Sequence, residues 1–287
     1  MKSYKIIGGD GVELNVVETG NLVGQPIVFI HGFTQSLHAW SKQLNSDLAD
    51  DFRLVAFDIR GHGESGKPAE MESYLDSKLW GDDVNAVIEG LGLERPILVG
   101  WSYAPLIILD YVRHYGESNI GGMHFVGGIT KLGTEEATGY LTPDILKLVP
   151  GFFSSDETES TASLRSLIDL FFANEPTSED VSFMLDYERA VPSFVRQALF
   201  SRTLDNDDLL STSTIPLLIT HGVGDRIVFQ AAAEQIASVA PNSELHRPDN
   251  VGHAAFWEDA EVFNRRLREF AERIAGSGVA VASNTAP

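Results

Sequence analysis

Gly100-Trp101-Ser102-Tyr103-Ala104 lies between two apolar runs, residues 96–99 before it and residues 105–109 after it. The first run predicts a buried strand and the second a helix, so the serine is expected at a sharp turn from strand to helix. Such a turn exposes a serine hydroxyl near a helix N-terminus, which favours a developing negative charge. Pro105 suits the first helical turn, because the N–H that it lacks would be unpaired there anyway. The pattern therefore indicates a nucleophilic serine.

The same short pattern also occurs at ordinary strand ends, so its meaning depends on the rest of the chain. Two further apolar runs, residues 26–30 and 54–57, predict buried strands. Each run ends in a polar turn that contains glycine, residues 31–36 after the first and residues 58–65 after the second. Farther along, an apolar run leads to Asp225, and His253 follows. A serine, an aspartate and a histidine thus occur in that order.

Five motifs together resemble those of the α/β-hydrolase superfamily. They are the H-G-F turn at 31–33, the D-x-R-G-H-G-x-S loop at 58–65, the elbow at 100–104, the G-x-G-D loop at 222–225 and the G-H pair at 252–253. The resemblance covers roughly residues 25–272. It implies an α/β protein with the α/β-hydrolase fold, in which helices cover both faces of a mostly parallel central sheet and a helical cap is inserted.

The resemblance also implies roles for individual residues. Ser102 would attack the substrate, His253 would act as general base, and Asp225 would orient the histidine. The backbone N–H groups of Phe33 and Tyr103 would form the oxyanion hole.

The substrate pocket is expected beside these groups. The elbow has Ala104 and Pro105 where many members of the superfamily have glycines, so more side-chain bulk is expected next to the nucleophile. Residues that flank the motifs are the candidates for the pocket wall, namely Thr34, Trp101, Ile129 and Trp257.

The other polar residues of the motifs have simpler interpretations. His31 and His62 lie in turns and are expected to hold them by hydrogen bonds. Asp58 and Arg60 predict an internal charge pair or a clamp for the second turn, and contact of this loop with substrate stays open. His221, which precedes Asp225 at a strand end, is conceivable as a second base. His253 is the better candidate because it lies in the G-H motif. The histidines show no H-x-x-x-H or H-x-E spacing and the chain has no cysteine, so neither a metal nor a cofactor is expected.

Composition limits the class of protein. The 287 residues are 43% apolar and carry a net charge of −20, which disfavours a nucleic acid as partner. A chain without cysteine, without an apolar leader and without a run of roughly 20 apolar residues is expected to be cytoplasmic and to span no membrane. The oligomeric state stays open between a monomer and a homodimer.

The apolar pattern also predicts the organisation of the chain. Strands and helices alternate up to about residue 130 and again after residue 213, which is typical of a parallel sheet with crossover helices. Helical periodicity dominates between them, with Thr177 as one helix start. We therefore expect a core domain of residues 1–130 and 214–275, a cap of residues 131–213, and a disordered tail of residues 276–287.

The sequence thus predicts a cofactor-free serine carboxylesterase that cleaves ester bonds of small, largely apolar substrates through an acyl-enzyme. Lactones and thioesters remain open as substrates, because they need the same groups. A cofactor-free perhydrolase or haloperoxidase-type activity is one alternative. A hydrolase-derived ligand receptor with slow turnover is another, and rapid turnover without a partner would distinguish the enzyme from the receptor. Ser102 argues against the enzymes of this fold that use an aspartate nucleophile.

Overall fold

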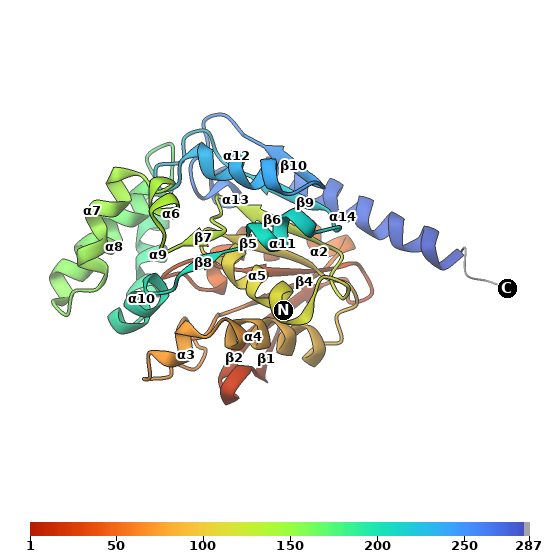
Figure 1. Cartoon of the computed structure of the whole chain (residues 1–287), viewed down its shortest axis with the longest axis horizontal. Coiled ribbons are helices and arrows are strands. Elements are labelled where there is room, and N and C mark those ends of the chain that lie inside the picture. The colour runs from red at the N-terminus through yellow and green to blue at the C-terminus, as the bar shows by residue number, and fades with distance from the viewer. Residues whose placement is uncertain (284–287) are drawn as a thin grey trace.

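The structure, a computed structural model, describes the backbone of residues 1–283 and the side chains of residues 1–276 (Figure 1). Its centre is an eight-stranded sheet in the order β1-β2-β4-β3-β5-β6-β9-β10. All neighbouring pairs are parallel except those of β2 with β1 and with β4. The strands are β1 (Lys2–Ile7), β2 (Glu13–Gly20), β3 (Pro26–Ile30), β4 (Arg53–Phe57), β5 (Ile97–Trp101), β6 (Gly122–Val126), β9 (Leu217–Thr220) and β10 (Ser243–His246).

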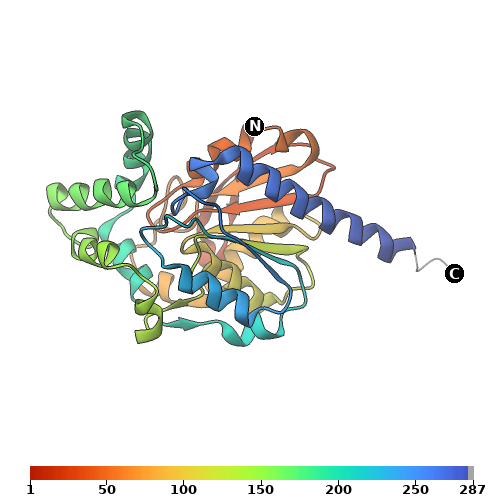
Figure 2. The same ribbon diagram turned by 90° about the horizontal axis from the view of Figure 1, so that it is seen from above.

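Helices cover both faces of this sheet, as the α/β-hydrolase resemblance implies (Figure 2). On β3, Ile27 and Phe29 pack into one buried cluster while Val28 and Ile30 pack into another, because successive side chains of a strand point to opposite faces. A strand that is buried on both faces reads as a continuous apolar run, which is why the sequence revealed it.

The two faces are covered by different sets of helices. One face packs against α4 (Ser77–Gly90), α5 (Ala104–Tyr115), α11 (Asp207–Thr212) and α12 (Gln230–Val239). The other face packs against α1 (Ser41–Leu44), α2 (Leu48–Asp51), α13 (Ala255–Glu258) and α14 (Ala260–Ser283). Short elements complete the core: the 3-10 turns η1 (Gly9–Gly11) and η2 (Leu37–Trp40), and α3 (Glu72–Leu75).

Five helices between β6 and β9 lie together at one end of the sheet (Figure 1). We call residues 135–200 the helical insertion; its helices are α6 (Glu135–Gly139), α7 (Pro143–Phe152), α8 (Glu157–Leu170), α9 (Ser178–Arg189) and α10 (Ser193–Phe200). A two-stranded ladder of β7 (Lys131–Leu132) with β8 (Leu204–Asp205) closes the insertion at its base. The predicted range 131–213 is therefore too long, because Leu210 of α11 belongs to the buried core and α11 contacts α5 and α12.

The start of α9 was predicted correctly. Thr177 is its N-cap, and the Thr177 hydroxyl accepts a hydrogen bond from the Asp180 N–H at 3.1 Å.

The C-terminal end differs from the prediction. The disordered tail expected from residue 276 is wrong for residues 276–283, because α14 continues to Ser283. Extending a helix that is already formed adds one backbone hydrogen bond per residue, and an internal glycine costs only about 1 kcal/mol. Residues 284–287 lie outside the described residues. Within the described chain, no helix has the length and apolar character needed to cross a bilayer.

Candidate active site

Ser102 occupies the turn between β5 and α5, in a strained backbone conformation. Its φ of 60° lies in the left-handed region, which residues other than glycine seldom adopt. Two backbone hydrogen bonds hold it there: its N–H donates to the Val126 carbonyl at 2.9 Å, and its carbonyl accepts from the Ile129 N–H at 3.1 Å. The turn therefore presents the serine side chain at the carboxyl end of the sheet.

Two glycines allow other loops to approach the site closely. A Cβ atom on Gly32 would lie 2.9 Å from the Cβ of Ser102. Gly127 has a φ of 51°, and a Cβ there would lie 2.9 Å from Nδ1 of His253. Only glycine therefore lets these backbones lie against the serine and the histidine.

Asp225 and His253 form a buried pair. Nδ1 of His253 lies 2.8 Å from Oδ2 of Asp225, while Oδ1 of Asp225 accepts from the N–H groups of Ile227 at 2.8 Å and Val228 at 3.0 Å. Burial by itself would raise the pKa of Asp225, but His253, His221 and the Val228 amide outweigh it, so this pKa is lowered. The carboxylate is thus ionised and fixes the ring of His253.

His221 contacts the same carboxylate from another side. Its Nε2 lies 3.0 Å from the Val228 carbonyl and 3.2 Å from Oδ2 of Asp225, so Nε2 carries the proton and donates to these oxygens. Burial lowers the pKa of His221, and the ring is neutral at pH 7. His221 therefore supports Asp225 and is not placed as a second base.

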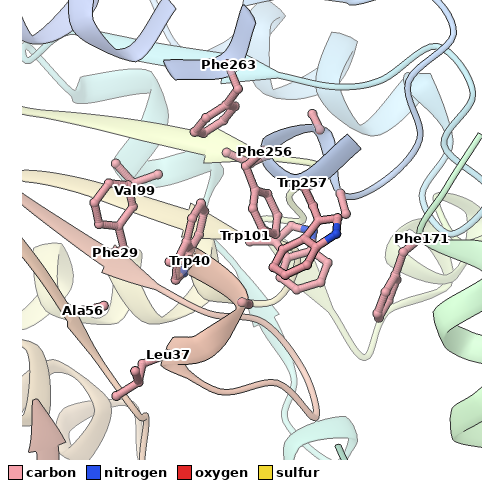
Figure 3. Packing of buried hydrophobic residues seen from close by; sticks show 14 of the residues in the cluster. Phe29, Leu37, Trp40, Ala56, Val99, Trp101, Phe171, Phe256, Trp257 and Phe263 are labelled. Carbon is pink, nitrogen blue, oxygen red and sulfur yellow. The ribbon is translucent and has the colours of Figure 1, made fainter. Parts of the chain in front are cut away.

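His253 and Ser102 line the same pocket. Nε2 of His253 is buried without a hydrogen-bond partner, and Ser102 Oγ has none among the described residues. Trp101 anchors the histidine from the core, because its indole N–H donates to the His253 carbonyl at 3.0 Å. The Trp101 ring packs 4.8 Å from that of Phe256, which in turn lies 4.3 Å from Trp40 (Figure 3).

The turn of residues 32–35 lies beside Ser102 and carries the Phe33 amide. The Gly32 carbonyl accepts from the Gln35 N–H at 3.3 Å and contacts Nδ1 of His31 at 3.0 Å. Because Nε2 of His31 accepts from the Ile59 N–H at 3.1 Å, Nδ1 carries the proton and donates to Gly32. In a trans peptide the N–H points opposite to the C=O, so the Phe33 N–H points away from His31. Neither this N–H nor that of Tyr103 has a hydrogen-bond partner within the described chain.

The pocket is mostly apolar, and residues of the helical insertion form part of its lining. Its lining comprises Phe33, Ser102, Tyr103, Ile129, Leu132, Leu141, Ile145, Leu167, Phe171, Phe200, Ile227, Val228 and His253. The hydroxyl of Tyr103 donates to the Leu199 carbonyl at 3.1 Å. The polar side chains that remain for a ligand are therefore those of Ser102 and His253.

Three of the four predicted pocket residues do not line this pocket. Ile129 does, but Thr34, Trp101 and Trp257 do not, and the prediction is wrong for these three. Thr34 is buried and bonds the Phe33 carbonyl at 2.7 Å, Trp101 is a core residue, and the Trp257 indole reaches Asp180 at 3.2 Å. The insertion supplies wall residues that sequence reasoning missed, such as Leu141 and Ile145, which no motif marks.

Within the described residues, no group of three His, Cys, Asp or Glu side chains could hold a metal ion.

His31 and His62 hold their turns as predicted. Nδ1 of His31 contacts the Gly32 carbonyl at 3.0 Å, and Nδ1 of His62 contacts the Arg60 carbonyl at 2.9 Å. The predicted Asp58–Arg60 pair is wrong, because Arg60 pairs with Asp83 at 2.7 Å.

Comparisons with known proteins agree with this fold. The family described as "alpha/beta hydrolase fold" matches residues 25–260. The crystal structure of an esterase from Rhodococcus sp. ECU1013 superposes with a TM-score of 0.90 at 34% identity, covering 96% of this chain and 100% of that one. An esterase from Exiguobacterium antarcticum has a TM-score of 0.82 at 25% identity, covering 94% and 100%. A non-heme chloroperoxidase of Kitasatospora aureofaciens is 27% identical, covering 91% of this chain and 96% of that protein.

Proposed function

The chain belongs to the alpha/beta-hydrolase family, and from this membership we propose that it is a serine esterase acting on small, largely apolar esters through an acyl-enzyme. One observation carries the proposal. Ser102 and His253 line the same pocket, and Nε2 of His253 has no hydrogen-bond partner while its other nitrogen is bonded to Asp225 at 2.8 Å.

The proposed chemistry follows from these positions. Ser102 Oγ attacks the ester carbonyl carbon while its proton passes to Nε2 of His253. The tetrahedral intermediate expels the alcohol, which takes that proton from His253. Water then attacks the acyl-enzyme, with His253 accepting a proton from the water and returning it to Ser102 as the acid leaves.

Two backbone amides would stabilise the oxyanion. The N–H groups of Phe33 and Tyr103 have no partner in the described chain, and both residues line the pocket. Preorganised donors of this kind lower the barrier by roughly 3 kcal/mol each. The fixed Gly32 carbonyl supports this role because it orients the Phe33 amide.

The pocket wall favours an uncharged, apolar acyl group. Ile145, Leu167 and Phe200 from the insertion meet Ile129 and Val228 from the core, and none of the lining residues is an aspartate, glutamate, lysine or arginine. We propose that the helical insertion acts as the cap that excludes water from this pocket. Burying an ionised substrate here would be costly, which favours neutral esters.

Labelling with a fluorophosphonate tests the assignment. We expect stoichiometric modification, mapped by mass spectrometry to Ser102, with rapid turnover of short p-nitrophenyl esters in the absence of any partner protein. Ser102→Ala should lose both the label and more than about 10³-fold of kcat, while Ser238→Ala, on the exposed surface, should change neither. A label on another residue, or an active Ser102→Ala variant, would contradict the proposal.

A second candidate is perhydrolysis, which the resemblance to the non-heme chloroperoxidase favours. It needs the same acyl-enzyme, attacked by hydrogen peroxide in place of water, so that a peracid leaves and Ser102 is restored. Peroxide-dependent halogenation in acetate buffer, abolished by Ser102→Ala, would support this activity.

A further inference from the structure

The turn that carries the Phe33 amide is strained and ends in a buried glutamine. Thr34, at the third position of this turn, has a φ of 60°, which a β-branched residue rarely adopts. The surrounding structure must therefore hold the turn. The next residue, Gln35, is 1% exposed, and its side chain leaves the core for the helical insertion.

Gln35 contacts a carboxyl group on α9. Its Nε2 donates to Oε1 of Glu188 at 2.6 Å, and Glu188 is fully buried. Two atoms of this pair have no partner, Oε1 of Gln35 and Oε2 of Glu188. Both atoms are acceptors if the carboxyl is ionised, so an ionised pair leaves two buried acceptors unsatisfied.

A proton on Glu188 resolves this mismatch. A carboxylic acid has one O–H donor, and the amide oxygen of Gln35 is the acceptor that lacks a donor. An acid and a primary amide are complementary in this way: the amide N–H donates to one carboxyl oxygen, and the acid O–H donates to the amide oxygen.

The neighbouring charged groups do not pair with Glu188. The guanidinium of Arg196 on α10 is occupied by the Val191 and Phe152 carbonyls and by the Ser160 hydroxyl, all at 2.8–3.0 Å. No ion pair joins it to Glu188 within the described chain.

Two other titratable groups belong to these surroundings: Tyr187 on α9 interacts with Glu188, and His62 interacts with Arg196. Burial raises the pKa of Tyr187 and lowers that of His62, so both are neutral at pH 7. Burial also raises the pKa of Glu188 well above its usual value, against the opposing effects of Gln35 and Arg196.

We propose that Glu188 is a positioning residue that acts as a neutral acid: its carboxylic group and the Gln35 amide form a cyclic pair that ties α9 to the oxyanion turn and holds the Phe33 amide in place. This inference rests on the proposed esterase function. Loss of the proton at alkaline pH would break one half of the pair and loosen the turn.

Glu188→Gln is the decisive variant. A glutamine amide has an N–H where the acid has its O–H, so this variant retains both hydrogen bonds at every pH. We expect its kcat to stay within about twofold of wild type at pH 7 and to lack the reversible alkaline decline that Glu188 causes. Glu188→Ala should lower kcat at least tenfold with little change in KM. Glu179→Gln, on the exposed side of the same helix, is the matched control and should behave as wild type.

A second readout does not depend on activity. The infrared C=O stretch of a protonated, buried carboxyl should be present at pH 7 in the wild type and missing in Glu188→Gln. If this band is missing in the wild type, or if folded Glu188→Gln loses more than tenfold of kcat, the neutral-acid assignment is overturned.

Glu188→Ala at full kcat would overturn the positioning role. Gln35→Leu should reproduce the effect of Glu188→Ala if the latter fails to fold, and full kcat in that variant would overturn the role as well. Failure of the esterase proposal is recognised separately, by absence of the Ser102 label.

Discussion

Two histidines contact the same oxygen of Asp225, and their hydrogen bonds assign them different roles. His253 leaves its second nitrogen unpartnered in the pocket, whereas His221 donates its proton to Asp225 and to the Val228 carbonyl. The sequence placed both residues at the edge of the sheet but contained no signal for their orientation. The hydrogen bonds therefore distinguish His253, the proposed base, from His221, which supports Asp225.

Asp225→Asn is expected to lower kcat by about 10³–10⁴-fold while the protein remains folded. An asparagine amide facing Nδ1 of His253 would donate a hydrogen bond to it, which moves the proton to Nε2, the atom that must accept one from Ser102. Steady-state kinetics with a short ester measures the loss. Asp208→Asn, which removes an exposed carboxylate from its Arg113 pair, is the control and should keep wild-type kcat. Equal kinetics for the two variants would refute the role of Asp225.

Side chains next to a motif residue were poor predictors of the pocket. Trp101 precedes Ser102, but successive residues of a strand point to opposite faces, so its indole lies in the core beside Phe256. Thr34 follows Phe33 and is buried beneath the turn. The motifs therefore place backbone and catalytic groups, while the pocket wall depends on the tertiary packing of α7, α8 and α10.

At the scale of elements, a buried ion pair joins the segment after α10 to α5. Arg202 donates to Oδ2 of Asp110 at 2.6 Å, and a second nitrogen lies 3.4 Å from the Tyr103 hydroxyl. Side chains of both charged residues are at most 1% exposed. The helix that begins just after Ser102 is thereby fixed to the base of the helical insertion.

Arg202→Met should reduce the free energy of unfolding by about 3–5 kcal/mol, because it leaves the Asp110 carboxylate buried without its partner. Replacing both residues, as Arg202→Met with Asp110→Leu, should recover much of the loss. Urea denaturation of the single and double variants measures both effects. The control is Arg113→Met, in a partly exposed pair with Asp208, where we expect less than about 1 kcal/mol. A loss as small for Arg202 as for Arg113 would show that the buried pair contributes little.

Charge pairs between elements were not predictable from sequence spacing. Arg60 was expected to pair with Asp58, yet its guanidinium reaches Asp83 on α4, while Asp58 accepts from the Leu37 amide and the Asn15 side chain. Which carboxylate meets the arginine depends on how α4 packs against the sheet. By contrast, the start of α9 was predictable, because a cap depends only on residues three apart.

At the scale of the whole molecule, the apolar runs predicted a parallel sheet and the family resemblance implied helices on both of its faces. The structure confirms both expectations for a mostly parallel sheet. The order of the strands could not be predicted from the sequence, because β6 pairs with β9 although the entire helical insertion separates them along the chain. The end of the chain was mispredicted for another reason: small residues suggested disorder, whereas α14 continues from a packed amphipathic segment.

Buried neutral histidines should make the stability of the whole protein sensitive to acid. Burial lowers the pKa of His124 from 6.5 to about 3, and its ring packs 5.2 Å from Phe263. The unfolded chain then binds a proton that the folded chain cannot, so this stabilising contribution is complete above pH 6.5 and is lost as the pH falls toward 3. Between pH 6.5 and 5.0 one such residue removes about 2 kcal/mol from the free energy of unfolding.

His124→Gln should therefore show a shallower loss of stability over this range than the wild type, whatever its stability at pH 7.5. His38→Gln is the control for the same replacement at an exposed position, and it should change the slope less than His124→Gln does. Urea midpoints measured at half-unit steps of pH give the three slopes. Groups that titrate alike in the wild type and in His124→Gln cancel when the two slopes are compared, so the difference in slope is assigned to His124. Parallel curves for the wild type and His124→Gln would mean that the folded protein accommodates a charged ring at this position, and that the core around β6 is less tightly closed to water than its packing indicates.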